Sequence, residues 1–197
     1  MNYTAKIQRL VRRRGVRFLL HFTQVANLPE IMQHGLLPRR ELVKPLHTAY
    51  VSAEYRLDDD DNAISVSIDR LHGTFFSKRK SSGHSDWAVL ALSPEILWTH
   101  ECRFCWENAA RKEIKEHRGW MGGPWAFEQM FSEDLGTREG LPDSCPTDAD
   151  AEVQVFNVIA PNHILAIAVN RSDLVSPVEQ MLAQLVSSPP PVFAEEF

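Results

Sequence analysis

The sequence of 197 residues lacks the features that mark membrane-spanning, secreted and disulfide-bonded proteins. Its longest apolar stretches, such as residues 164–169, are far too short to cross a bilayer, and residues 1–8 contain no apolar core of a signal peptide. Three cysteines are an odd number in a chain without such a signal, which does not indicate a disulfide framework. We therefore expect a soluble, cytoplasmic protein with reduced thiols and no membrane partner.

The sequence also lacks a net positive charge. The formal charge is -5 at pH 7, so no global positive field draws the chain onto a nucleic acid duplex. Basic side chains form two local runs, one at residues 78–80 and one at Arg9, Arg12, Arg13, Arg14 and Arg17. Either run could contact a few phosphates, and the alternatives are a solvated surface or a contact with a partner protein. The acidic run at residues 58–61 would repel phosphate and is expected in a solvated loop.

Hydrophobic residues make up 44% of the chain, enough to bury one core in a protein of 22.5 kDa. Apolar and alternating runs predict strands at residues 17–23, 50–55, 63–68, 87–92, 152–158 and 164–169. A two-turn helix is predicted from Asn27, a potential cap, to Gly35, with Pro29 in its first turn. A helical turn at residues 94–98 and a polar amphipathic helix at residues 107–115 complete the pattern.

The chain is expected to have three parts. Residues 1–16 are a basic N-terminal segment, residues 17–186 form the folded domain, and residues 187–197 are a flexible, proline-rich tail. Within the domain, residues 119–150 form a long connection rich in Gly, Pro and Asp. Irregular connections of this length are uncommon in compact domains and are often functional.

His21 and Thr23 are polar residues in an otherwise apolar predicted strand. Because one residue separates them, they point to the same face of the strand, where they can hold one edge of a ligand. The alternative is a core histidine that is satisfied by the backbone. The strand is followed by the polar and apolar pattern of residues 27–31 and then by His34-Gly35-Leu36-Leu37-Pro38.

This stretch closely resembles the first strand and following helix of the DarT family, which are NAD-dependent ADP-ribosyltransferase toxins that modify DNA bases. Further blocks follow in family order and cover most of residues 17–169; they are Tyr55-Arg56-Leu57-Asp58, the serine-rich strand at 64–68, Trp87-Ala88-Val89-Leu90, Asn108-Ala109-Ala110 and residues 146–153. One departure is Asp69-Arg70-Leu71, where the family pattern has a Pro-Asn pair next to the substrate-side loop.

The resemblance implies an α+β fold with a split, curved mixed β-sheet, flanking helices and a cleft for NAD, the co-substrate. It implies that the nicotinamide end of NAD is bound by His21, Thr23, Asn27, Leu28, Ile31, Gly35 and Leu36. It also points to Arg56 as a second catalytic residue, since a guanidinium can bind a pyrophosphate or a base through two hydrogen bonds. The alternative for Arg56 is a surface ion pair with residues 58–61.

Glu152 opens a predicted strand after the long connection, where the ADP-ribosyltransferase superfamily places its catalytic glutamate. Cleavage of the bond between nicotinamide and ribose builds an oxocarbenium-like centre. A nearby carboxylate can stabilise this centre or accept the proton of the nucleophile. We therefore expect Glu152 to be the catalytic carboxylate, and the alternative is a strand-edge glutamate that faces solvent.

The connection at residues 119–150 carries large apolar side chains at Trp120, Trp125, Phe127, Met130 and Phe131. Aromatic faces on an irregular segment can stack on an unpaired base, at about 1 to 3 kcal/mol per base, and they can equally anchor the loop on the core. We expect both uses, with Trp120, Trp125 and Arg138 in contact with the substrate.

Cys102 and Cys105, with His100 and His117 nearby, raise the alternative of a zinc site. The second pair of ligands lacks the spacing of a zinc finger or ribbon, and cysteines three residues apart would pack one face of a helix. We therefore expect no metal.

Together with the resemblance, these residues predict an enzyme that transfers ADP-ribose from NAD to a base of single-stranded DNA. The resemblance places it in a toxin-antitoxin or phage-defence system, with an antitoxin protein as partner. An unpaired base is accessible without the opening of a duplex. The alternatives are the same chemistry on RNA, ADP-ribosylation of protein, and a non-catalytic module that binds NAD or nucleic acid.

Overall fold

The sheet at the centre of the protein has seven strands among the residues that the structure describes. The computed structural model describes residues 2–42, 62–70 and 85–197, so the predicted strand at 50–55, the runs at 58–61 and 78–80, and Arg56 lie outside the described residues. The strand order is β4-β5-β2-β1-β3-β6-β7. The strands are β1 (Leu19–Gln24), β2 (Ile64–Ile68), β3 (Trp87–Leu92), β4 (Cys102–Cys105), β5 (Glu152–Val155), β6 (Ile164–Val169) and β7 (Val192–Ala194).

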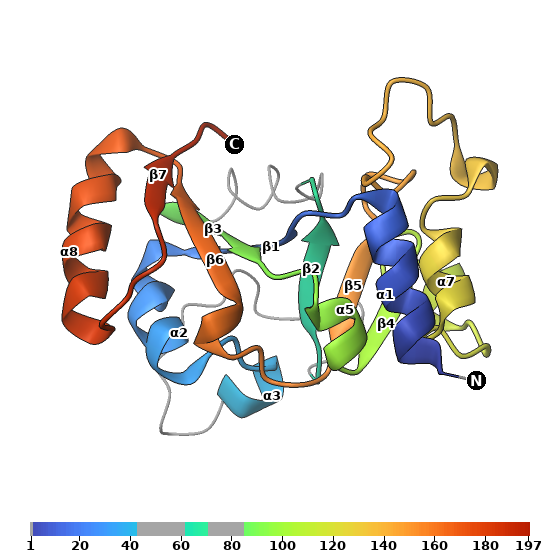
Figure 1. Ribbon diagram of the computed structural model, residues 1–197, viewed down its shortest axis with the longest axis horizontal. Helices are drawn as coiled ribbons and strands as arrows, with labels where there is room; N and C mark the ends of the chain where they lie inside the picture. Colours follow the sequence, from blue (N-terminus) through green and yellow to red (C-terminus); the bar gives the residue numbers. More distant parts are fainter. Residues whose placement is uncertain (1, 43–61, 71–84) are drawn as a thin grey trace.

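The sheet divides between β1 and β2. These two strands share only two residue pairs, Leu19 with Ile68 and Leu20 with Ser67, whereas β1 pairs with β3 along its whole length. Figure 1 shows β4, β5 and β2 as one half and β1, β3, β6 and β7 as the other. All neighbouring strands are antiparallel except β6 and β7, which are parallel. The predicted split, mixed sheet of an α+β fold is confirmed.

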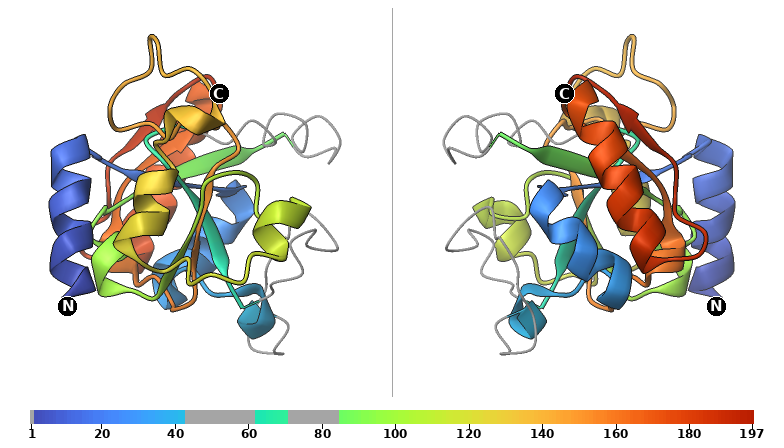
Figure 2. Two further views of the ribbon diagram at one scale, coloured as in Figure 1. Left: turned by 90° about the vertical axis from the view of Figure 1, so that its right-hand side faces the viewer. Right: turned by 90° about the vertical axis from the view of Figure 1, so that its left-hand side faces the viewer.

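Helices cover both halves of the sheet. On one half, α1 (Tyr3–Arg14) packs against α5 (Ile96–Thr99) and α7 (Pro124–Gln129), and on the other half α2 (Leu28–His34) packs against α8 (Val175–Leu185). Figure 2 shows these two groups from opposite ends of the molecule. Single turns form α3 (Arg39–Leu42) and α6 (Lys112–Lys115), and short 3-10 helices lie at Val25–Asn27, Glu133–Leu135, Pro161–His163 and Ser172–Leu174.

The described helices are all too short or too polar to cross a bilayer. The predicted strands at 63–68, 87–92 and 164–169 are confirmed as β2, β3 and β6, and the predicted helix at 27–35 is confirmed as α2. The strand predicted at 152–158 begins as expected at Glu152 and ends at Val155. Alternation and apolar runs therefore located the interior of the sheet.

The basic N-terminal segment is a helix of the folded body. Asn2 accepts a hydrogen bond from the backbone N–H of Ala5 at 3.2 Å, which caps α1, and Gly15 ends the helix with a φ of 66°. Ile7, Leu10 and Val11 recur at helical spacing and are buried. The prediction of a separate segment at residues 1–16 identified the charge of this helix but missed its apolar face.

The prediction of a flexible C-terminal tail was wrong for the part that forms β7. Val192 pairs with Ile167 of β6, and the backbone N–H of Ile167 donates to the oxygen of Pro191 at 2.9 Å. An edge strand offers a row of backbone donors and acceptors to any segment that reaches it. That partner is distant in sequence, which is why the local proline pattern pointed to a flexible tail.

Two other predictions were also wrong. Cys102 and Cys105 do not pack a helix face, because residues 102–105 pair with β5 along their whole length as β4. The helix predicted at residues 107–115 is limited to the four residues of α6, and α8 was not predicted. Short elements such as β4 depend on their neighbours in the sheet more than on their own pattern.

Candidate active site

Glu152 is held at the start of β5, an interior strand between β4 and β2. The residue is only 8% exposed. Its Oε1 accepts a hydrogen bond from the backbone N–H of Ala109 at 2.9 Å, and its Oε2 accepts one from the hydroxyl of Ser65. Donors on both oxygens fix the position of the carboxylate. Glu152 is therefore not the solvent-facing edge residue of the alternative interpretation.

Two serines of β2 lie on the same face of the sheet as Glu152. Ser65 pairs with Gln154 and Val66 pairs with Val153, so the register continues to Ser67 opposite Glu152. The hydroxyl of Ser67 is buried and has no hydrogen-bond partner among the described residues. A buried hydroxyl in this state costs stability until a ligand or a water molecule pairs with it. The site therefore has an unused polar group next to its carboxylate.

His21 connects the two halves of the sheet. Its Nδ1 lies 3.0 Å from the backbone oxygen of Ser65, beyond the point where β1 and β2 stop pairing. Because a carbonyl oxygen only accepts, Nδ1 carries the hydrogen and donates it. The ring is thus satisfied by the backbone, as the alternative for a core histidine requires. It is also connected to Glu152, since Ser65 contacts both residues.

The polar residues that follow His21 contact each other. Asn27 donates through Nδ2 to Oγ1 of Thr23 at 3.0 Å. This bond ties the end of β1 to the first turn of α2, and the side chain of Asn27 does not cap α2 as the sequence predicted. The contact of Thr23 and Asn27 with NAD stays a prediction.

The remaining residues predicted to bind NAD form the frame of α2. Leu28, Ile31 and Leu36 are at most 7% exposed and belong to the core. Gly35 ends α2 with a φ of 83°, and a Cβ at this position would lie 2.5 Å from the backbone oxygen of Ile159. The glycine is therefore required by the fold, whatever its role toward a ligand.

The segment before Glu152 has both buried and exposed large side chains. Phe127, Met130 and Phe131 are buried in the core, whereas Trp120 is 63% and Trp125 is 54% exposed. The three buried residues anchor the segment. The two exposed tryptophans present aromatic faces to solvent, which is the arrangement that stacking on a base requires.

A cluster of rings lies close to the start of β5. The ring centroid of Trp125 lies 5.5 Å from that of Trp106 and 6.2 Å from that of His117, whose ring is nearly parallel to it. Trp106 directly follows Cys105, whose backbone pairs with Glu152. The cluster therefore begins one residue beyond the strand partner of the carboxylate. Trp106 and His117 were not among the residues that the sequence predicted to contact the substrate.

A family model described as "ssDNA thymidine ADP-ribosyltransferase, DarT" matches residues 20–196. The chain belongs to the DarT family. The predicted resemblance to this family is thus confirmed over nearly the whole domain. No curated protein matches the chain.

Solved DarT structures share the fold of this chain. Thermus sp. 2.9 DarT in complex with NAD+ has 14% sequence identity and a TM-score of 0.65, with 90% of this chain and 94% of that chain covered. The same protein in complex with ADP-ribosylated ssDNA has 15% identity and a TM-score of 0.65, covering 92% and 95%. Thermosipho africanus DarTG in complex with ADP-ribose has 17% identity and a TM-score of 0.56, and the match covers 90% of this chain but only 50% of that one.

Arg138 braces the long segment that leads to Glu152 in this DarT chain. Its guanidinium donates to the backbone oxygen of Cys145 at 2.9 Å, to Oγ1 of Thr147 at 2.9 Å and to the backbone oxygen of Pro142 at 3.1 Å. Three donors of one planar group thereby fix the turn at residues 142–147. A direct contact of Arg138 with the substrate stays a prediction.

The departure from the DarT pattern at residues 69–71 supplies a second brace. Arg70 donates to the backbone oxygens of Pro146 at 2.8 Å and Thr147 at 3.2 Å. Asp69 has a φ of 51° and accepts from the backbone N–H groups of Arg17 and Phe18. The end of β2 is therefore tied to the substrate-side segment and to the start of β1.

The cysteines of this DarT chain do not form a shared metal site. Cys102 and Cys105 lie three residues apart on a strand, and such residues point to opposite faces of the sheet. Burial, and secondarily the charge of Glu101, raise the pKa of the Cys102 thiol to about 12. A thiol in this environment is a poor source of the thiolate that zinc requires. Among the described residues no cluster of His, Cys, Asp and Glu has the arrangement of a metal site.

Proposed function

We propose that this chain transfers ADP-ribose from NAD to a thymidine base of single-stranded DNA, with Glu152 as the catalytic carboxylate. The observation that carries the proposal is the position of Glu152. It is a buried carboxylate, fixed by Ser65 and Ala109, at the start of the strand where the family resemblance places the catalytic glutamate. The family description names ssDNA thymidine as the acceptor, and the matched Thermus sp. 2.9 DarT forms complexes with NAD+ and with ADP-ribosylated ssDNA.

The reaction breaks the bond between ribose C1′ and nicotinamide, and the bonding electron pair leaves with nicotinamide. C1′ then bonds to the accepting atom of the base, which loses a proton. A fixed carboxylate stabilises the positive charge that develops at the ribose and can accept that proton. Because both oxygens of Glu152 are already held by donors, little reorganisation is needed as the charge develops.

The NAD side of the site is proposed to include His21, Thr23 and Asn27, with the backbone of the α2 frame around Gly35. His21 and Glu152 both contact Ser65, so a ligand beside one of them also lies near the other. The buried hydroxyl of Ser67 fits this proposal, because a polar co-substrate would supply the partner that it lacks among the described residues. Arg56, which is outside the described residues, is proposed as the second catalytic residue on the resemblance alone.

The acceptor side is proposed to be the segment that carries Trp120, Trp125 and Arg138. A base that is already unpaired can stack on an exposed aromatic ring without the cost of opening a duplex. Single-stranded DNA is favoured over RNA because the family description names ssDNA.

The partner is proposed to be an antitoxin protein. One of the matched structures is a DarTG chain of which this chain spans about half the length. Both proposed substrates, NAD and DNA, are intracellular, so we propose that the reaction takes place in the cytoplasm.

The test of this function is a comparison of acceptors. The protein is incubated with NAD labelled in the adenosine moiety and with separate pools of single-stranded DNA, duplex DNA of the same sequence, RNA and protein. We expect covalent label on single-stranded DNA, and little on the duplex. Label on RNA or protein alone would support one of the alternative transferases, and binding of NAD without transfer to any pool would support a non-catalytic module.

A further inference from the structure

The helix α1 has no part in the proposed reaction. It precedes residue 20, where the match to the DarT family begins. Residues 1–18 contain six of the 21 Lys and Arg residues of the chain and none of its 26 Asp and Glu residues, so the rest of the protein is strongly acidic by comparison. Such a separation of charge is an electrostatic footprint for an anionic ligand.

Two basic side chains of α1, Arg9 and Arg12, point away from the core. Ile7, Leu10 and Val11 face α5 and α7, so Arg9 and Arg12 are placed on the solvent side of the helix, and both are exposed. Among the residues that the structure describes, the side chains of Arg9 and Arg12 have no ion-pair or hydrogen-bond partner. Arginines without a partner pay no cost of breaking an existing pair when an anion binds.

The C-terminal end of α1 reaches the segment that leads to Glu152. The guanidinium of Arg14 lies 4.6 Å from the ring centroid of Phe131, and that of Arg138 lies 5.6 Å from the same ring. Because both guanidiniums face one ring, two cations lie close together here, and burial, followed by the charge of Arg138, lowers the pKa of Arg14. Figure 1 shows this end of α1 next to the chain between α7 and β5.

The strand register also places the residues that follow α1 near Glu152. The register of β2 with β5 continues to Ser67 opposite Glu152, and Asp69 directly follows the last residue of β2. The carboxylate of Asp69 accepts from the backbone N–H groups of Arg17 and Phe18, directly after α1. Arg17 is therefore near the end of the sheet at which Glu152 begins β5.

Exposed aromatic rings lie at both ends of the helix. Tyr3 is 45% exposed and contacts Trp120, which is 63% exposed, with 5.0 Å between ring centroids. Phe18 is 36% exposed, and the guanidinium of Arg17 lies 5.7 Å from its ring centroid. A row of arginines bounded by exposed rings is the composition of surfaces that bind single-stranded nucleic acids, where cations contact the backbone and rings stack on bases.

We propose that the α1 basic face, defined as Arg9 and Arg12 of α1 with Arg17 three residues beyond the helix, binds the phosphates of the DNA strand that carries the modified base. The exposed side chain of Arg17 also forms an ion pair with Asp69 at 3.8 Å. This inference rests on the proposed function. In this arrangement α1 binds the backbone of the DNA, and the base that is modified binds at the site of Glu152. It also reconciles a net charge of -5 with a polyanionic ligand, because residues 1–18 carry six basic and no acidic side chains.

The test is the salt dependence of binding to a single strand of about 15 nucleotides, which is within the range of known site sizes. The double variant Arg9→Gln/Arg12→Gln is compared with the wild type by fluorescence anisotropy, without NAD. Loss of two phosphate contacts should lower the slope of log K against log salt by about 1.4, and each arginine should be worth about fivefold in affinity near 0.1 M salt.

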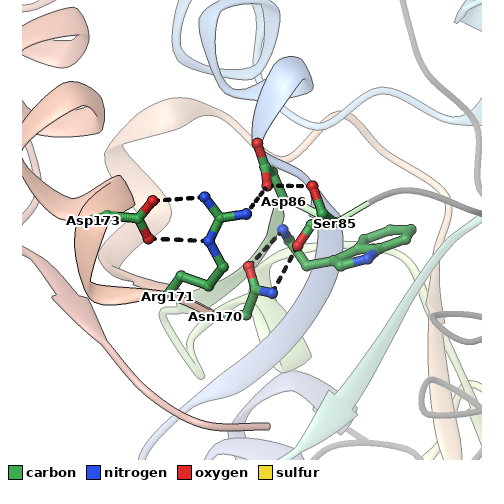
Figure 3. A network of polar contacts seen from close by, with 6 residues as sticks. Ser85, Asp86, Asn170, Arg171 and Asp173 are labelled. Carbon is green, nitrogen blue, oxygen red and sulfur yellow. Dashed lines mark hydrogen bonds and ion pairs between the residues drawn. The ribbon is translucent and has the colours of Figure 1, made fainter.

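The matched control is Arg171→Gln. Like each substitution of the double variant, it removes one positive charge. Arg171 is ion-paired with Asp86 at 2.8 Å and Asp173 at 2.6 Å after β6, in the far half of the sheet (Figure 3). Its removal should leave the slope unchanged. An unchanged slope in the double variant, or an equal change in the control, would overturn the proposal. The binding assay contains no NAD and therefore does not depend on transfer. If the slope does not change but ADP-ribose is still transferred to DNA, this inference fails and the proposed function stands. If no transfer to DNA occurs, the proposed function itself fails.

Discussion

Substitution Ser65→Ala isolates the hydrogen bond that holds Glu152. The hydroxyl of Ser65 donates to one carboxylate oxygen, while the backbone oxygen of the same residue accepts from His21. Alanine removes the hydroxyl and keeps the backbone contact. The other carboxylate oxygen keeps its donor at Ala109, so the variant loosens Glu152 without releasing it.

The size of the effect follows from the charge of the acceptor. A hydrogen bond to a charged group is worth about 1.5 to 3 kcal/mol, and about 1.4 kcal/mol corresponds to a factor of ten in rate. If the bond serves to position Glu152, kcat should fall by about 10- to 150-fold, with little change in the affinity for NAD. Single-turnover transfer from labelled NAD to DNA measures the first quantity, and titration calorimetry measures the second.

Substitution Ser67→Ala is the matched control for stability. Ser67 lies on the same face of β2, but its buried hydroxyl has no partner among the described residues. Its removal should leave the melting temperature unchanged or raise it, whereas Ser65→Ala should lower it. A folded Ser65→Ala protein with kcat within about threefold of wild type would refute the positioning role, because that factor is below the value of one charged hydrogen bond.

Three further predictions concern the surroundings of the site. Trp120→Ala and Arg138→Ala should lower transfer to oligonucleotides while NAD binding stays nearly unchanged, and loss of NAD binding in both variants would show that this segment serves the other ligand. Gly35→Ala should lower the free energy of unfolding by about 1 to 3 kcal/mol or more, and the melting temperature with it, because φ is 83° and the added Cβ lies 2.5 Å from the backbone oxygen of Ile159. An unchanged melting temperature would contradict that geometry. Cys102 should resist alkylation by iodoacetamide at pH 8 in the native protein and react after unfolding, because its pKa of about 12 leaves almost no thiolate; mass spectrometry of the labelled protein checks this, and rapid labelling of native Cys102 would refute it.

The sequence predicted the interior of the fold better than its edges. The alternation of Ile64, Val66 and Ile68 predicted β2, and Glu152 was correctly placed at the start of β5. These strands have a strong pattern of their own because one or both faces are buried. By contrast, β4 and β7 are short and are defined by pairing with β5 and β6, which local patterns do not show.

The candidate site was predicted in part for the same reason. Motif order identified His21 and Glu152, but the residue that contacts both, Ser65, was noted only as part of a strand. Its role depends on the register between β2 and β5 and on the split between β1 and β2. Likewise, Arg70 differs from the family pattern, and only the fold shows that it holds the segment at Pro146 and Thr147.

The most direct test of the central claim is the transfer activity of Glu152→Gln. Glutamine has nearly the same shape, and its amide can accept from Ala109 and donate to Ser65, so the fold and NAD binding should persist. The rate of transfer of labelled ADP-ribose to single-stranded DNA should fall by a factor of about 100 or more, since positioned acid-base catalysis is typically worth at least that. A folded variant that binds NAD and retains more than about a tenth of the wild-type rate would contradict the assignment of Glu152 as the catalytic carboxylate.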